Sequence, residues 1–210
     1  MFKLTTLLCS LLLTAALSAQ VITLLPPQRV NGKSIMECLH LRKSTKSFEF
    51  GKVLSAQQLS NILFAAGGIN RANGKLTIPT ARNLQNQSVY AVLPGQGIYL
   101  YIPRQHSLQL IRQGDFMDKI GRQSYHKDAS LILIYVSNMP AIGGSAEVQA
   151  SASGTHAGAA AQNVYLYAAS EGLGSVICGN FDGKHLFDLL KLTDGKKVFY
   201  IQPVGFAKGQ

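Results

Sequence analysis

Residues Ser130 to Asn138 read SLILIYVSN, a continuous apolar run that is typical of a central strand covered on both faces. Upstream, the stretches 88–94 and 97–103 form two further strands that a tight Pro-Gly turn joins, which indicates a hairpin. A last strand is expected over 197–207. Helices and strands are mixed without the alternating rhythm of parallel sheets. The sequence therefore predicts an α+β fold with a central, largely antiparallel sheet covered by helices.

Helical patterns lie on both sides of this strand. Ser34 to Leu41 predicts a short helix, and Ser55 with Gln58 forms a capping box that opens a helix ending at Gly67-Gly68. A longer helix carries a stripe of small residues and stops at Gly172; we expect it in the core or at a dimer contact. A shorter helix is predicted over 183–190. The small, polar stretch 136–154 predicts a loop or a mobile lid over a substrate pocket.

The first residues have the pattern of a secretory signal peptide. Lys3 precedes an apolar run from Leu7 to Leu17, and Ala19 marks the expected cleavage site. We expect residues 1–19 to be the signal and 20–210 a single domain, exported to the periplasm or beyond without stable membrane insertion. The formal charge is +10, but the cations are scattered and an exported protein rarely meets nucleic acid. A smaller anionic ligand or plain surface charge is the expectation.

Cysteine use is sparse after the predicted cleavage site, with Cys38 and Cys178 alone. One disulfide is an open alternative, but we expect two free, mostly buried thiols.

The stretch 41–48, LRKSTKSF, gathers three cations and three hydroxyls. Arginine offers a planar fork of donors, lysine a point charge and the hydroxyls fill remaining oxygens, so the stretch suits a phosphate. A solvated turn after a helix is the alternative. Side-chain catalysis is poorly supported, because the sequence lacks the nucleophile elbow, the phosphate loop and the zinc-protease motif, and its five histidines share no metal-ligand spacing. This favours a bound cofactor over a metal or a catalytic side chain.

Five motifs appear in an order that resembles the FMN-dependent nitroreductase-like family, and most closely its exported branch related to the thiazoline/oxazoline dehydrogenases. They are RKSTKSF (42–48), LSAQQLSNILFAAGG (54–68), PTARN (79–83), the paired Val-Tyr and Ile-Tyr strands, and AQNVYLYAASEGLG followed by GNFD (161–174 and 179–182). The resemblance implies a nitroreductase-like fold, an intertwined homodimer with two FMN sites, and chemistry carried by the flavin.

The resemblance also implies which residues bind the cofactor. Those that contact the phosphate and ribityl chain are Arg42, Lys43, Ser44 and Lys46. The loop that reaches the flavin from the other subunit contributes Pro79, Thr80, Ala81, Asn83 and Gln85. The turn whose amides face the flavin N5 edge is Cys178, Gly179 and Asn180. Further contacts are expected from Arg122 and Gln123, and from Lys208 as the remainder of a basic C-terminus. Phe48 is expected to anchor the phosphate segment in the core.

Two functions follow from these motifs. The first is an FMN-dependent oxidoreductase of the nitroreductase or dehydrogenase type, which passes hydride or electron pairs through N5 to or from a small planar substrate. The second is a non-catalytic protein of the same fold that holds a flavin or another planar anion.

Overall fold

The computed structural model describes residues 20–30 and 32–209, so the predicted signal peptide lies outside the described residues. A seven-stranded sheet has the spatial order β1-β4-β3-β2-β5-β7-β6, with every pair antiparallel. The strands are Val21–Thr23 (β1), Gln87–Leu93 (β2), Gly97–Ile102 (β3), Ser107–Gln113 (β4), Leu131–Asn138 (β5), Gly174–Ser175 (β6) and Lys196–Gly205 (β7). The helices are Ile35–Leu41 (α1), Ala56–Gly67 (α2), Ala146–Ser170 (α3) and Gly183–Leu189 (α4).

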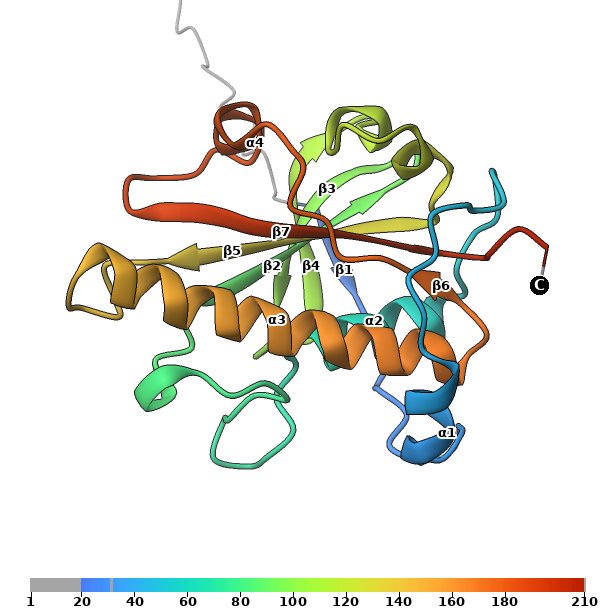
Figure 1. Ribbon diagram of the computed structural model, residues 1–210, viewed down its shortest axis with the longest axis horizontal. Coiled ribbons are helices and arrows are strands. Elements are labelled where there is room, and N and C mark those ends of the chain that lie inside the picture. Colours follow the sequence, from blue (N-terminus) through green and yellow to red (C-terminus); the bar gives the residue numbers. More distant parts are fainter. Residues whose placement is uncertain (1–19, 31, 210) are drawn as a thin grey trace, which may run out of the picture.

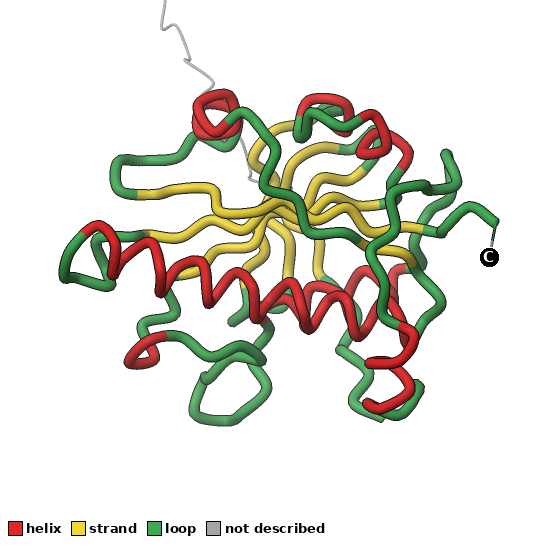
Figure 2. The backbone as a smooth tube through the Cα atoms, viewed as in Figure 1, coloured by secondary structure: helices red, strands yellow, loops and turns green. Residues whose placement is uncertain are grey.

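Helices cover both faces of the sheet. α2 and α3 lie on one face, while α4 and short 3₁₀ turns lie on the other (Figure 1). The tube view shows the strands fanning about β7, as expected for a twisted sheet (Figure 2). Alternate residues of β5 enter the two cores: Leu133 and Tyr135 face α3, and Ile132 and Ile134 face α4. All four are fully buried, which confirms the doubly covered central strand and the predicted α+β fold.

Several predicted boundaries are confirmed within a residue or two. The Ser55 hydroxyl accepts from the Gln58 amide at 3.1 Å and the Gln58 side chain accepts from Ser55 N at 3.0 Å, so the capping box opens α2. At the other end, the Gly68 amide donates to Phe64 O at 2.8 Å and closes the helix. The β2–β3 hairpin turns at Gly95, whose φ is +69° and suits glycine. Within the described residues, no helix combines the length and apolarity needed to cross a bilayer.

The predicted lid over 136–154 is wrong in its second half. β5 continues to Asn138, and α3 already begins at Ala146, so the connection is short. The Ser145 hydroxyl accepts from Val148 N at 3.4 Å and caps the helix, with Glu147 in its first turn where the helix dipole favours an acid. Small polar residues weaken helix propensity only slightly, and packing on the sheet overrides that weakness.

Three strands escaped prediction: β1, β4 and β6. β1 and β6 are very short, and each is defined by its pairing with a neighbour rather than by its own pattern. β4 carries a usable signal, since apolar Leu108 and Leu110 alternate with polar Ser107 and Gln109.

Two histidines, His126 and His156, are buried and a third, His106, is half-buried, which predicts a pH dependence of stability. Burial lowers the pKa of His106, His126 and His156 from the ordinary value of 6.5. The unfolded chain therefore binds more protons than the native chain once the pH falls below about 7. Stability should be full above that range and should decline as the pH falls toward the lowered native values.

We expect the melting temperature to be lower at pH 5.5 than at pH 7.5, measured by circular dichroism at constant ionic strength. Carboxylates titrate mostly below this window. His156→Gln keeps an acceptor for its hydrogen-bond donor but cannot titrate, so the decline should be smaller in this variant. A melting temperature that is flat or rises toward pH 5.5 would contradict the prediction.

Candidate active site

The segment 42–48 runs beside the edge of the sheet at β6. Arg42 follows α1, and its amide donates to Cys38 O at 2.8 Å. Ser44 forms a parallel bridge with Ser175, and the Thr45 amide donates to Ser175 O at 2.9 Å. Further along, Phe48 is fully buried and bridges Ala207, which confirms its predicted role as an anchor. The backbone of the basic segment, residues 42–48, is therefore held to the sheet. This leaves its polar side chains available to bind a ligand.

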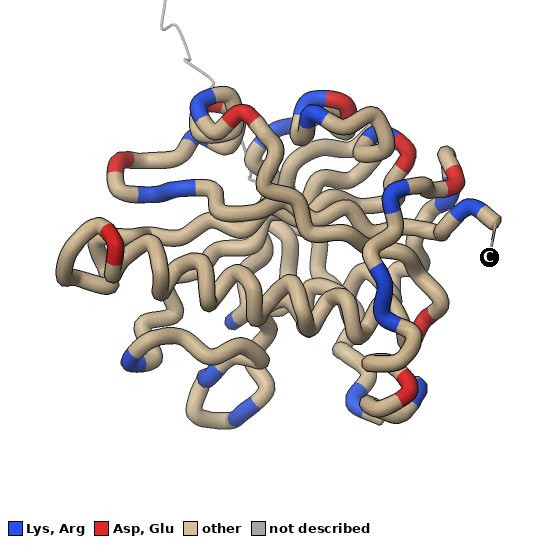
Figure 3. The backbone as a smooth tube through the Cα atoms, in the orientation of Figure 1, with Lys and Arg blue, Asp and Glu red and all other residues tan. Residues whose placement is uncertain are grey.

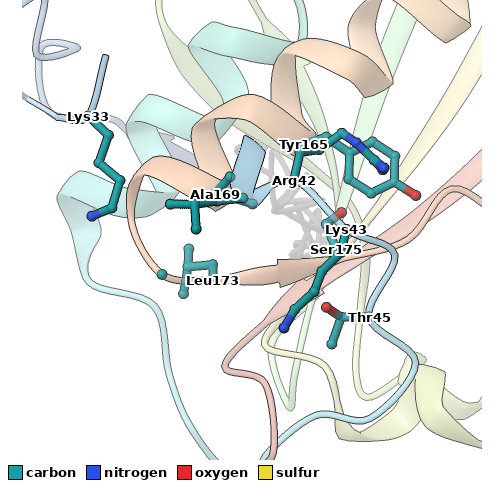
Figure 4. Close-up of a pocket in the computed structure, with 11 residues that line it drawn as sticks. Lys33, Arg42, Lys43, Thr45, Tyr165, Ala169, Leu173 and Ser175 are labelled. Atoms are coloured by element: carbon teal, nitrogen blue, oxygen red, sulfur yellow. The ribbon is translucent and has the colours of Figure 1, made fainter. Parts of the chain in front are cut away.

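A cavity of about 270 Å³ opens between α1, the C-terminal half of α3 and β6. Its polar lining comes from Lys33, Arg42, Lys43, Thr45, Tyr165 and Ser175. In Figure 4, the Arg42 guanidinium lies over the Tyr165 ring, and Lys43 and Thr45 lie on the side of Ser175. The guanidinium carbon is 5.2 Å from the ring centroid, within the range of a cation–π interaction.

The cavity is electropositive. Lys33, Arg42 and Lys43 line it without any acidic residue among its lining, and the one ion pair found among the described residues is Lys52–Glu49, away from the cavity. Lys and Arg gather along this segment in Figure 3. Close cations that lack carboxylate partners repel one another, so an anionic ligand would relieve that repulsion.

Tyr165 is a site residue that the sequence analysis missed. Its side chain is 6% exposed, and its hydroxyl lies 3.0 Å from the Ser44 hydroxyl and 2.8 Å from Ile177 N. It sits within the Gln-Asn-x-Tyr motif, but α3 is apolar on both sides of it, and that pattern indicates a core position. The role of Tyr165 in the site becomes evident only from the packing of α3 against residues 42–44.

The turn at Cys178 follows β6 directly. Cys178 exchanges backbone hydrogen bonds with Ile201 at 2.8 and 3.0 Å, and the Arg122 amide donates to Asn180 O at 3.4 Å. Gly179 and Asn180 are exposed, and neither amide donates to another described residue. A Cβ added to Gly179 would meet nothing within 4 Å. The turn therefore presents open amides, and it brings Arg122 to the predicted flavin-facing residues.

Cys178 and Cys38 are both free and buried, as predicted. The Cys178 sulfur is 3.3 Å from the Tyr125 hydroxyl. Burial raises the pKa of the Cys178 thiol, and the Tyr125 hydrogen bond and the nearby Lys46 charge oppose this to a smaller extent. The thiol is therefore mostly neutral at pH 7 and packs as a small apolar side chain.

Two further predicted residues lie near this end of the molecule. The Lys208 amide donates to Ser47 O at 3.2 Å, so the C-terminus is adjacent to the basic segment. Gln123 begins the 3₁₀ turn Ser124–Asp128, and its Oε1 is buried without a hydrogen-bond partner among the described residues. Arg122 is exposed beside it.

The predicted loop 79–85 lies elsewhere. The Ala81 amide donates to His156 Nε2 at 2.8 Å, and His156 is nine residues, or about 14 Å, before Tyr165 along α3. Asn83 and Gln85 both have positive φ values, +57° and +48°, and Gln85 N donates to the Thr80 hydroxyl at 3.1 Å. Within this chain the loop, which also contains Pro79, does not join the other predicted residues.

The basic segment and the turn at 178–180 together fit a phosphate-bearing cofactor, although Ser44, Lys46, Gly179 and Asn180 do not line the cavity itself. The cations and hydroxyls of the segment suit the phosphate, and the open Gly179 and Asn180 amides suit a polar ring edge. Small-molecule sites usually enclose about 300–1,000 Å³, whereas this cavity has about 270 Å³.

The fold is a helix-covered antiparallel sheet with an electropositive cavity at one edge, and known proteins share this architecture. The model of the nitroreductase family matches residues 40–206. A Methanocaldococcus jannaschii protein that carries a nitroreductase name is 30% identical over 165 residues, which are 72% of this chain and 81% of that protein. A Ralstonia eutropha crystal structure with a nitroreductase name has a TM-score of 0.84 at 36% identity and covers 90% of each chain.

A more distant solved structure shows the fold alone. It is the microcin synthetase complex of Escherichia coli, with a TM-score of 0.71 at 14% identity over 86% of this chain and 75% of that chain. The chain belongs to the nitroreductase family. Members are generally flavin-dependent oxidoreductases, and this protein is an oxidoreductase of that family.

Proposed function

We propose that the protein is an FMN-dependent oxidoreductase that acts on a small planar substrate and works as a homodimer. The observation that carries the proposal is the electropositive cavity beside a turn with open amides. Arg42, Lys43 and Lys46 would neutralise the phosphate, with Lys208 as a further cation at its edge. The Gly179 and Asn180 amides would orient the ring edge.

Homodimerisation is supported by the surface around the cavity. On α3, Glu147 is the one charged residue, and Cβ atoms added at Gly154 and Gly158 would meet nothing within 4 Å. Beside it, α1 exposes Ile35 (59%), Met36 (71%) and Leu39 (48%). A small, uncharged helix face with an apolar border suits a second subunit. The loop 79–85, distant within one subunit, would then complete the site of the other.

When bound, FMN supplies a redox centre that accepts and returns a hydride or electron pair at N5. The protein's own part is to bind, orient and enclose. Cations on the segment 42–46 hold the phosphate, and the donors of the turn hold the ring. Burial raises the pKa of the Cys178 thiol, which makes it a poor nucleophile at pH 7, and we assign the chemistry to the flavin and the donors of the turn rather than to a catalytic side chain.

We further propose that the chain is exported and acts in the periplasm or outside the cell, on the basis of the pattern in residues 1–19. Nicotinamide cofactors are scarce there. The enzyme would therefore take electrons from another donor, or run as a dehydrogenase of the kind that forms thiazole and oxazole rings.

The test is the visible spectrum of the purified protein, combined with mass identification of its bound molecule. We expect a yellow protein that carries one FMN per subunit and has the mass of a dimer in solution. A colourless protein that FMN cannot reconstitute would overturn the cofactor assignment.

A second measurement separates an enzyme from a flavin carrier. After photoreduction under nitrogen, the protein is mixed with a panel of quinones and nitroaromatics. An enzyme should discriminate among acceptors of similar potential. Reoxidation rates that follow potential alone would identify a carrier.

A further inference from the structure

Tyr165 joins the two halves of the cofactor site within one subunit. Its hydroxyl contacts Ser44 on the basic segment at 3.0 Å and Ile177, next to the flavin-facing turn, at 2.8 Å. Its ring lies under the Arg42 guanidinium, as Figure 4 shows. The nearly buried Tyr165 side chain thus contacts both Ser44 and Arg42 of the basic segment, and it also contacts Ile177, which precedes the turn.

The available donors and acceptors favour one direction for the Ser44–Tyr165 hydrogen bond. A backbone amide can only donate, so the Tyr165 oxygen accepts from Ile177 N. The phenol hydrogen then needs an acceptor, and Ser44 Oγ is the one acceptor within hydrogen-bond distance among the described residues. If Ser44 donated to Tyr165 instead, the hydrogen of this 6% exposed phenol would have no acceptor among the described residues.

When Tyr165 is the donor in this hydrogen bond, the hydroxyl hydrogen of Ser44 is not used by it. With Tyr165 donating to its oxygen, Ser44 can turn its own O–H toward a ligand as a polarised donor. Ser44 is itself exposed, so a ligand can reach it. The adjacent Arg42, held over the ring, would approach the same ligand.

We infer that Tyr165 is a positioning residue for the cofactor phosphate: its hydroxyl sets Ser44 as a donor, and its ring holds Arg42 in place. The inference rests on the proposed FMN site. It assigns to the apolar helix α3 a part in phosphate recognition.

The experiment compares FMN with riboflavin, which lacks the phosphate, in titrations of apo-protein followed by flavin fluorescence. In Tyr165→Phe we expect the preference for FMN over riboflavin to fall about tenfold, the size of one lost hydrogen bond to a charged group. Ser44→Ala should lose a similar factor, and the double variant should lose no more than either single one. Equal losses for both flavins, or losses that add, would overturn the inference.

Tyr167→Phe is the matched control. Tyr167 is also on α3, and its hydroxyl accepts from Asn61 Nδ2 at 3.2 Å, away from Ser44. The preference of the Tyr167→Phe variant for FMN over riboflavin should match that of the wild-type protein. If Tyr165→Phe is too unstable to titrate, Ser44→Ala carries the test, and an unchanged preference in that variant overturns the inference. Wild-type protein that binds no FMN would instead overturn the proposed function.

Discussion

Replacing Arg42 and Lys46 by alanine should strip the flavin from the protein. Each cation is expected to make a charge-assisted hydrogen bond to the cofactor, worth about 1.5–3 kcal/mol. Together their loss should weaken FMN binding by at least about a hundredfold. The dissociation constant is measured by quenching of flavin fluorescence on apo-protein, and the flavin content of the purified variant by its spectrum.

A charge-matched control separates this effect from the overall charge. Lys196→Ala with Lys197→Ala removes two positive charges at the start of β7, the end of that strand that lies opposite the C-terminus in Figure 1. This double variant should keep FMN affinity within about twofold, since charges separated by more than a Debye length of about 8 Å are screened. Full retention of FMN by the Arg42/Lys46 variant would refute the assignment of the segment as the phosphate site.

Among these substitutions, Phe48→Ala should cause the largest decrease in the free energy of unfolding. Phe48 is fully buried within the cluster beneath α4, and truncating a buried phenylalanine costs about 3–5 kcal/mol. For a chain of this size that corresponds to a fall of about 10 °C or more in melting temperature. Since Phe48 also anchors the basic segment, FMN affinity should fall as well, at temperatures where the variant is folded.

Phe50→Ala is a control two residues away. Its side chain is 77% exposed, so its removal should change the free energy of unfolding by less than about 0.5 kcal/mol. Both variants are measured by urea denaturation followed by circular dichroism. Similar losses in the two variants would show that burial at position 48 does not anchor the segment.

Local patterns were sufficient for much of the fold. The capping box at Ser55, the Gly68 stop and the β2–β3 hairpin depend on hydrogen bonds between residues a few positions apart, so their sequence carries the information. Strands β1 and β6 pair with strands that are distant in the sequence. Their own residues therefore do not predict that they form strands. The first turns of α3 were missed because sheet packing outweighs the weak propensity of serine and glycine there.

The same distinction between local patterns and contacts distant in sequence applies to the candidate site. The residue types at 42–46 and 178–180, together with the order of motifs that resembles the nitroreductase family, predict a phosphate-binding segment and a permissive turn, because charge and the absence of a side chain are local properties. Only the tertiary structure brings Lys208 to Ser47, Arg122 to Asn180 and Tyr165 to Ser44. Only the tertiary structure, likewise, holds the loop 79–85 away from them. These placements depend on packing between elements distant in sequence, which no local pattern encodes.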